Sequence, residues 1–299
     1  MDIRGALKEA MARLRVAEVA SHTLAAELLL MHALDCQRAW LYGHPEHPLS
    51  PQVSAHYFHL VAKRAAGTPV QYLTGKQEFW GLEFAVGPGV LIPRPESEHL
   101  MEVALERLGP AHAGSKFRHG EPGAALRVAD VGTGSGCLAI ALARELPEAR
   151  VWATDISPLA LEFARRNAAR HGVADRIEFL EADLLGSFLP GATAASAAPF
   201  NLIVSNPPYL GRGLANQLAP EVRDHEPPLA LFGGQEGTEL YAALIHQAAQ
   251  VLPPGGVLVL ELGYGAVERV MESIGFSWTR VAITNDLAGI PRVLAAERA

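Results

Sequence analysis

The sequence predicts an α/β fold with a mostly parallel, doubly wound sheet, preceded by a small helical domain. From residue 126 onward, short apolar runs alternate with segments of helical periodicity, which is typical of parallel strands joined by helices. The first seventy or so residues instead show only helical patterns. We therefore expect a helical bundle at 1–76, a β-hairpin linker at 77–94 and an α/β domain at 95–299.

Three helices are predicted in the first segment. The apolar faces of the first two follow from helical spacing: Ile3, Leu7, Met11 and Leu14, then Leu24, Leu28, Met31 and Leu34. The third helix has clear end signals, with Ser50 as N-cap, Pro51 in the first turn and Gly67 past the end. Its apolar face is Val53, Tyr57, Leu60 and Val61.

The remaining elements follow in order along the chain. Alternating apolar residues at 78–92 predict the hairpin, and a helix follows from Pro95 to Leu108. Glycine-rich residues 109–124 and alanine-rich residues 191–198 are predicted loops. The predicted strands are 126–130, 151–155, 177–180, 201–205, 257–261, 278–283 and 292–296, with helices at 137–146, 159–171 and 240–252.

Composition narrows the class of protein. The 299 residues are 49% hydrophobic and carry a net charge of −7, which is enough chain for two domains and argues against a protein that binds polyanions. The two cysteines, Cys36 and Cys137, require no disulfide framework. Neither a signal peptide nor a membrane-spanning stretch is evident, so we expect a cytoplasmic protein without membrane contact.

A glycine loop follows the first strand of the α/β domain. Residues Gly132-Thr133-Gly134-Ser135-Gly136 open a helix, where free N–H groups and bare backbone can approach a ligand. Dinucleotide-binding folds use a similar loop. The Gly-x-Gly-x-Gly spacing and the preceding Asp130 favour S-adenosyl-L-methionine over NAD.

Two further strand ends carry candidate cofactor ligands. Asp155 ends the second strand, about where a carboxylate would bind two ribose hydroxyls, a feature that serves NAD and S-adenosylmethionine equally. Asp183, followed by Leu184, comes after the third strand and is a candidate contact for an adenine amino group. The alternative for Asp183 is a capping or loop-solvating role.

The fourth strand ends in Asn206-Pro207-Pro208-Tyr209. Proline has no N–H, so this strand end offers a side-chain amide and free backbone carbonyls as acceptors. Such a site suits a planar NH2 group. We expect the Asn206 side-chain oxygen and the Pro207 carbonyl to accept the two amide hydrogens, with Tyr209 packing on the amide plane. Together with the cofactor loop, this predicts a class I S-adenosylmethionine-dependent methyltransferase with a seven-stranded sheet and no metal.

These motifs resemble those of the peptide chain release factor glutamine methyltransferase family over nearly the whole chain. The supporting segments are 68–75, 78–84, 90–98, 130–137, 206–209, 226–234 and 286–293. Ser97 stands where the family usually carries threonine. The resemblance implies methylation of the N5 amide of the glutamine in the Gly-Gly-Gln loop of class 1 release factors, with the helical domain helping to hold that partner.

Other functions stay open at this point. A sister enzyme methylates a glutamine of a ribosomal large-subunit protein, but the segment from Ile92 to Glu98 resembles the release-factor type. A nucleic-acid base methyltransferase shares the Asn-Pro-Pro-Tyr motif, although no basic recognition segment is evident and no direct nucleic acid binding is expected. An NAD-dependent oxidoreductase or a non-catalytic binding module would leave the motif at 206–209 without a role. Arg94 and Glu96 could shape the mouth of the pocket, or either Glu96 or Ser97 could complete a helix start. Glu226 has no assigned chemistry.

Overall fold

The computed structural model describes residues 1–109 and 126–299, so most of the predicted loop at 109–124 lies outside the described residues. The described chain divides into two compact units. We call them the helical unit (1–76, 86–88 and 218–226) and the α/β unit (77–85, 89–217 and 227–299). The boundaries expected from the sequence, 1–76, 77–94 and 95–299, stay a prediction.

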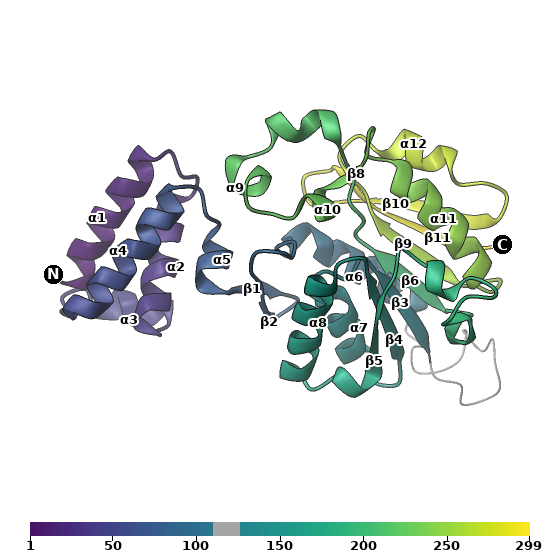
Figure 1. Cartoon of the computed structure of the whole chain (residues 1–299), viewed down its shortest axis with the longest axis horizontal. Helices are drawn as coiled ribbons and strands as arrows, with labels where there is room; N and C mark the ends of the chain where they lie inside the picture. The colour runs from purple at the N-terminus through teal and green to yellow at the C-terminus, as the bar shows by residue number, and fades with distance from the viewer. Residues whose placement is uncertain (110–125) are drawn as a thin grey trace. The chain divides into compact units, whose positions relative to one another are not determined.

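The helical unit is built mainly from five helices near the N-terminus (Figure 1): α1 (Ile3–Val16), α2 (His22–Leu34), α3 (Arg38–Gly43), α4 (Pro51–Ala65) and α5 (Val70–Thr74). A short helix, α9 (Pro220–Arg223), belongs to the same unit. The predicted start of α4 is confirmed, because the Ser50 hydroxyl accepts a hydrogen bond from the Val53 N–H at 3.2 Å. Tyr57, Leu60 and Val61 are buried as expected.

The predicted apolar faces of α1 and α2 are partly wrong. In α1 the buried side chains are Ile3, Ala6, Ala10 and Leu14, and in α2 they include Ala25, Ala26, Leu29 and Leu30. Small alanine side chains allow these helices to pack closely, whereas hydrophobic periodicity gives weight to larger residues. Leu24 is 44% exposed.

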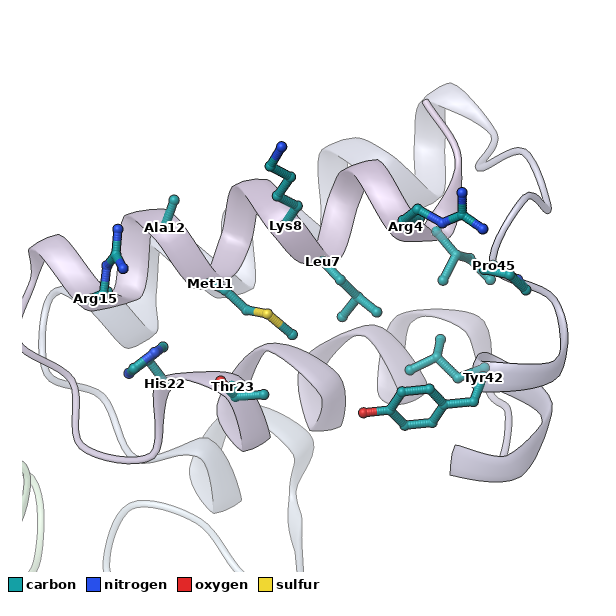
Figure 2. A pocket seen from close by; sticks show the side chains of 12 residues that line it. Arg4, Leu7, Lys8, Met11, Ala12, Arg15, His22, Thr23, Tyr42 and Pro45 are labelled. Atoms are coloured by element: carbon teal, nitrogen blue, oxygen red, sulfur yellow. The ribbon is translucent and has the colours of Figure 1, made fainter.

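Leu7 and Met11 are only half-buried, and they line a groove of about 620 Å³ in the helical unit. Figure 2 shows both side chains pointing from α1 toward the segment that carries Thr23. Arg4, Lys8 and Arg15 also line this groove. It therefore combines an apolar floor with cationic side chains.

The α/β unit begins with the predicted hairpin. Strands β1 (Lys76–Phe79) and β2 (Leu82–Ala85) form a two-stranded sheet, with Lys76 assigned to the helical unit. A 3₁₀ turn, η1 (Pro95–Ser97), leads into α6 (Glu98–Leu108), which ends at Gly109 as expected.

The main sheet has the predicted topology (Figure 1). Its seven described strands run in the order β10-β11-β9-β6-β3-β4-β5. Strands β3, β4, β5, β6 and β9 are parallel, and β11 and β10 add an antiparallel edge. Their bounds are β3 (Arg127–Val131), β4 (Arg150–Asp155), β5 (Ile177–Glu181), β6 (Leu202–Ser205), β9 (Val257–Glu261), β10 (Trp278–Asn285) and β11 (Pro291–Arg298).

Alternation along the central strands produces two cores, one on each face of the sheet. Val257 and Val259 of β9 pack in the core that includes α6 and α7, whereas Leu258 and Leu260 pack in the core that includes α11 and α12. The helices are α7 (Cys137–Glu145), α8 (Pro158–Arg170), α11 (Glu239–Val251) and α12 (Val267–Glu272).

Several short elements were not predicted. Strands β7 (Leu210–Gly211) and β8 (Phe232–Gly234) pair in parallel just after the Asn-Pro-Pro-Tyr segment. Four of the helices given above, α3, α5, α9 and α12, were also not predicted. The remaining unpredicted elements are η3 (Ala174–Arg176), η4 (Gly186–Phe188), η5 (Ala195–Ala197), η6 (Arg212–Gln217) and α10 (Pro228–Leu231). The alanine-rich insertion is not wholly solvated, because Ala197 is buried in the core beside α11.

Within the part of the chain that the structure describes, none of the helices has the length and apolar character needed to cross a bilayer.

Candidate active site

The glycine loop connects β3 to α7 at the carboxyl end of the sheet. The N–H groups of Gly132 and Thr133 both donate to the Thr154 carbonyl at 2.8 Å, which ties the loop to β4. Gly136 has a φ of +83°, and a Cβ there would lie 3.1 Å from Ala164 of α8. Glycine is therefore required at this position both by backbone conformation and by close packing.

Asp130 supports the loop from below. Its side chain is fully buried, and its Oδ2 accepts hydrogen bonds from the Thr133 hydroxyl at 2.6 Å and the Ala139 N–H at 3.0 Å. Its Oδ1 has no hydrogen-bond partner among the described residues. Burial raises the pKa of Asp130 to about 7, because removal from water disfavours the charged form.

Asp155 stands at the end of β4, next to the loop. Its two carboxylate oxygens accept backbone hydrogen bonds of 2.9 Å, Oδ2 from Gly134 and Oδ1 from Ser157. These contacts fix the carboxylate beside the glycine loop. Burial raises its pKa, and the backbone N–H groups work against that increase.

Asp183 and Leu184 follow β5 on the same edge of the sheet. Leu184 has a φ of +51°, and its carbonyl accepts a hydrogen bond from the Thr154 hydroxyl at 3.2 Å. The turn after β5 is thereby held against β4, next to Asp155.

A cavity of about 460 Å³ lies along this edge of the α/β unit. Its volume is in the range that holds a small-molecule cofactor. The predicted site residues that line it are Gly132, Thr133, Gly134, Ser135, Asp155, Asp183, Leu184, Asn206 and Pro208. Gly136, Pro207 and Tyr209 are not among the lining residues.

The side chains of this cavity fit S-adenosylmethionine. Asp155 and Asp183 offer carboxylate acceptors for hydroxyl and amino groups, and the fixed loop leaves open backbone above Gly132 and Gly134. Apart from the neighbouring Cys137 thiol, the buried Ser135 hydroxyl has no hydrogen-bond partner among the described residues, so it can still pair with a polar group of a ligand.

Just after β6, Asn206 belongs to a hydrogen-bonded series of side chains that the sequence did not predict. Its Nδ2 donates to the Ser97 Oγ at 3.0 Å, and the Ser97 hydroxyl donates to Oε2 of Glu261. Among the described residues, no donor is paired with the Asn206 Oδ1. Ser97 and Glu261 are 3% and 1% exposed, so this chain is shielded from water.

Ser97 thus does not play the helix-capping role that was one of the alternatives left open by the sequence. Its side chain makes no cap hydrogen bond at the start of α6. Glu261 ends β9, the neighbour of β6, and its carboxylate at a strand end was the one sequence signal that could have drawn attention to it.

Pro207 and Tyr209 are the residues of this motif that do not line the cavity. Pro207 is buried, and its carbonyl accepts no hydrogen bond from the described residues. The Tyr209 ring lies so close to Gly263 that a Cβ there would be 2.7 Å from the ring. Burial raises the pKa of Tyr209 to about 12, which keeps the phenol neutral.

Asn167 of α8 connects the hairpin to the cofactor loop. Its Oδ1 accepts from the Ala85 N–H at 2.8 Å, and its Nδ2 donates to the carbonyls of Ala85 at 3.0 Å and Ser135 at 2.8 Å. The side chain is fully buried. One amide therefore holds the edge of β2 and the Gly-Ser-Gly backbone at once.

Comparison with known proteins gives the same assignment along the chain. Residues 5–75 match the PrmC N-terminal domain family, and residues 118–220 match the methyltransferase small domain family. A release factor glutamine methyltransferase of Koribacter versatilis is 43% identical over 298 residues, covering 100% of this chain and 99% of its own length. Another, from Nitratidesulfovibrio vulgaris, is 40% identical over 301 residues, covering 99% of this chain and 95% of its own.

A more distant solved structure supports the fold alone. The hMettl16 catalytic domain in complex with MAT2A 3′UTR hairpin 6 is 16% identical, with a TM-score of 0.55 over 80% of this chain and 81% of that one. The full-length relatives decide the family. The chain belongs to the release factor glutamine methyltransferase family.

Proposed function

We propose that this chain methylates the side-chain N5 of the glutamine in the Gly-Gly-Gln loop of class 1 peptide chain release factors. The observation that carries this proposal is the identity of about two residues in five, over full length, with release factor glutamine methyltransferases. The free acceptor oxygens at Asn206 and Pro207 supply the matching chemistry. Because release factors act in translation, the proposal also implies a cytoplasmic enzyme.

S-adenosylmethionine, when bound, supplies an electrophilic methyl group on a sulfonium centre. We assign its binding to Gly132, Thr133, Gly134, Ser135, Gly136, Asp155, Asp183, Leu184 and Asn206. In this proposal Asp155 binds the ribose hydroxyls, and Asp183 with Leu184 contacts the adenine. The glycine loop holds the part of the molecule nearest the backbone N–H groups of α7.

A glutamine amide nitrogen is a weak nucleophile because its lone pair is delocalised into the carbonyl. Asn206 Oδ1 and the Pro207 carbonyl would each accept one hydrogen of the substrate NH2, which orients the nitrogen. Both oxygens also stabilise the positive charge that grows on that nitrogen during transfer. The extra proton is acidic once nitrogen is cationic, so no strong general base is required. Tyr209 excludes water from this side of the amide.

The helical unit is proposed to help hold the release factor. The support is its groove, in which Leu7 and Met11 lie beside Arg4, Lys8 and Arg15. Apolar floors with cationic neighbours suit a protein surface that carries both apolar and acidic side chains.

Mapping of the methylated atom tests the proposed function. The protein is incubated with labelled S-adenosylmethionine and a purified class 1 release factor, and the product is analysed by mass spectrometry. We expect the label on the glutamine of the Gly-Gly-Gln loop. Parallel reactions contain ribosomal large-subunit proteins, DNA and ribosomal RNA. Preferential labelling of any of these, or of another release-factor residue, would overturn the assignment.

A further inference from the structure

Three side chains from distant parts of the sequence form one hydrogen-bonded chain behind the acceptor site. Ser97 lies just before α6, Asn206 follows β6, and Glu261 ends β9. The carboxylate of Glu261 accepts the hydroxyl hydrogen of Ser97, and the Ser97 Oγ accepts the Nδ2 hydrogen of Asn206 at 3.0 Å.

The number of available hydrogens decides which group donates and which accepts in these two hydrogen bonds. A serine hydroxyl has a single hydrogen, and a carboxylate can only accept. Once Ser97 has donated to Glu261, its oxygen can only accept from Asn206. The Asn206 Nδ2 must therefore face Ser97, and Oδ1 must face the other way.

This direction matters because the two ends of an amide differ in chemistry but little in shape. A 180° rotation of the Asn206 side-chain amide would present an NH2 group where the proposed function needs an acceptor. Two NH2 groups facing each other cannot hydrogen-bond. The orientation of Asn206 must therefore be imposed by a neighbour.

We propose that Glu261, acting through Ser97, is a positioning residue that directs the Asn206 oxygen toward the substrate amide. This inference rests on the proposed function, because it assigns Asn206 to a substrate NH2 group. Among the described residues that line the cavity, Ser97 is included and Glu261 is not, so Glu261 acts on Asn206 through the Ser97 hydroxyl. Its backbone carbonyl is fixed in turn by the Tyr241 hydroxyl at 2.9 Å.

The charge state of Glu261 supports the same mechanism. Burial raises the pKa of Glu261 to about 7; the Ser97 hydrogen bond, Arg292 and Arg94 lower it, and Glu96 raises it. The buried phenols of Tyr209 and Tyr241 and the thiol of Cys137 also face this carboxylate. A protonated Glu261 could donate to Ser97 and would remove the constraint on Asn206. The productive direction therefore requires the ionised carboxylate.

The test compares variants at Ser97. Ser97→Ala removes the connection, whereas Ser97→Thr keeps a hydroxyl at the same position. Ser205→Ala is a matched control, since Ser205 is buried next to Asn206 but donates to the Val131 carbonyl at 2.7 Å instead. For each variant, kcat and KM for the release factor, the Kd for S-adenosylmethionine by calorimetry, and the Tm are measured.

We expect Ser97→Ala to lower kcat about tenfold, the usual effect of losing one orienting hydrogen bond, while the Kd for S-adenosylmethionine stays within about twofold. Ser97→Thr should retain most of kcat. Ser205→Ala should leave kcat near the wild-type value even where its Tm falls.

As a second measurement, the kcat of the wild type should rise with pH through about 7, and Glu261→Gln should flatten that profile. This measurement remains informative where Ser97→Ala folds poorly.

The outcomes separate the two claims. A wild-type protein that does not methylate the release factor refutes the proposed function. Methylation by the wild type with an unchanged kcat in Ser97→Ala refutes the role of Glu261 and Ser97. A parallel loss of Tm, cofactor affinity and kcat in both Ser97 variants would show a merely structural role and would also overturn the inference.

Discussion

Two buried carboxylates stand on either side of β6, the strand that Asn206 follows, and they have different roles. Asp130 lies on β3 and Glu261 on β9, the two neighbours of β6. Both are almost completely buried, and burial raises the pKa of each to about 7. Asp130 accepts hydrogen bonds from the glycine loop and from the start of α7, whereas Glu261 accepts one from the side chain of Ser97.

The difference between them lies in what each carboxylate holds. Asp130 holds the Thr133 side chain of the glycine loop and the Ala139 N–H of α7, so it shapes the floor on which the cofactor is proposed to lie. Glu261 fixes a side chain that fixes another side chain, so it sets which atom faces the substrate. Two carboxylates of similar burial and charge therefore have different roles: Asp130 on β3 supports cofactor binding, and Glu261 on β9 supports the orientation of the Asn206 side chain.

The largest effect on kcat is expected from a substitution of Asn206, which follows the strand between the two carboxylates. Asn206→Ala should lower kcat by roughly 10²–10³, the range seen when one preorganised transition-state contact is removed. The Kd for S-adenosylmethionine, measured by calorimetry, should change far less. Full methylation activity in Asn206→Ala would show that this residue does not hold the substrate amide.

The shared burial of the two carboxylates predicts a dependence of stability on pH. Their pKa values are raised in the folded state, so the folded protein binds more protons than the unfolded chain between about pH 4 and 7. The free energy of unfolding should fall as the pH rises through that interval and should level off above it. Each carboxylate contributes on the order of 3 to 4 kcal/mol at most.

Urea unfolding at pH 5 and pH 8 measures this effect. Asp130→Asn and Glu261→Gln should each gain stability relative to the wild type on going from pH 5 to pH 8, because an amide does not ionise. Variants whose stability keeps a constant difference from the wild type would show that these carboxylates do not titrate in this range.

The binding role of Asp130 predicts a change in cofactor affinity. Asp130→Asn weakens the acceptor for the Thr133 hydroxyl and the Ala139 N–H, so the loop is held less firmly. We expect about a tenfold increase in the Kd for S-adenosylmethionine, with a kcat near the wild-type value once the cofactor is saturating. A change in kcat without a change in Kd would contradict the proposal that Asp130 supports cofactor binding.

The orienting role of Glu261 predicts a lower kcat without a change in cofactor affinity, the opposite of the result expected for Asp130, and a smaller effect. In Glu261→Gln the amide oxygen can still accept from Ser97, but the amide NH2 can also donate, so only part of the molecules keep the productive direction. We expect kcat to fall by about fivefold with an unchanged Kd for S-adenosylmethionine. A higher Kd for S-adenosylmethionine with a normal kcat would show that Glu261, like Asp130, supports cofactor binding instead of orienting Asn206.

The parts of the site that sequence could predict are those in which one short segment carries the information. The glycine loop, the strand 257–261 and the acceptor motif at 206–209 each combine residue type and position within a few residues. The contact between Ser97 and Glu261 spans 164 positions and exists only because α6, which Ser97 precedes, packs against β9. No local pattern encodes that neighbourhood.

The predicted apolar face of α1 was partly wrong for a related reason. Periodicity gave weight to Leu7 and Met11, but Ala6 and Ala10 are fully buried, and Leu7 and Met11 are only partly buried against the same core. Which side of a helix is buried depends on how closely its neighbour approaches. Small side chains, which carry little weight in such patterns, allow that approach.

The amide of Asn167 has a consequence for the internal motions of the α/β unit. The Ala85 N–H can exchange its hydrogen with solvent only after its hydrogen bond to Asn167 breaks, and the same side chain donates to the Ser135 carbonyl. Opening of the hairpin edge and loosening of the glycine loop are therefore coupled events. A molecule that rigidifies the loop should slow deuterium uptake at Ala85, so that one backbone amide of the hairpin reports on the occupancy of the cofactor site.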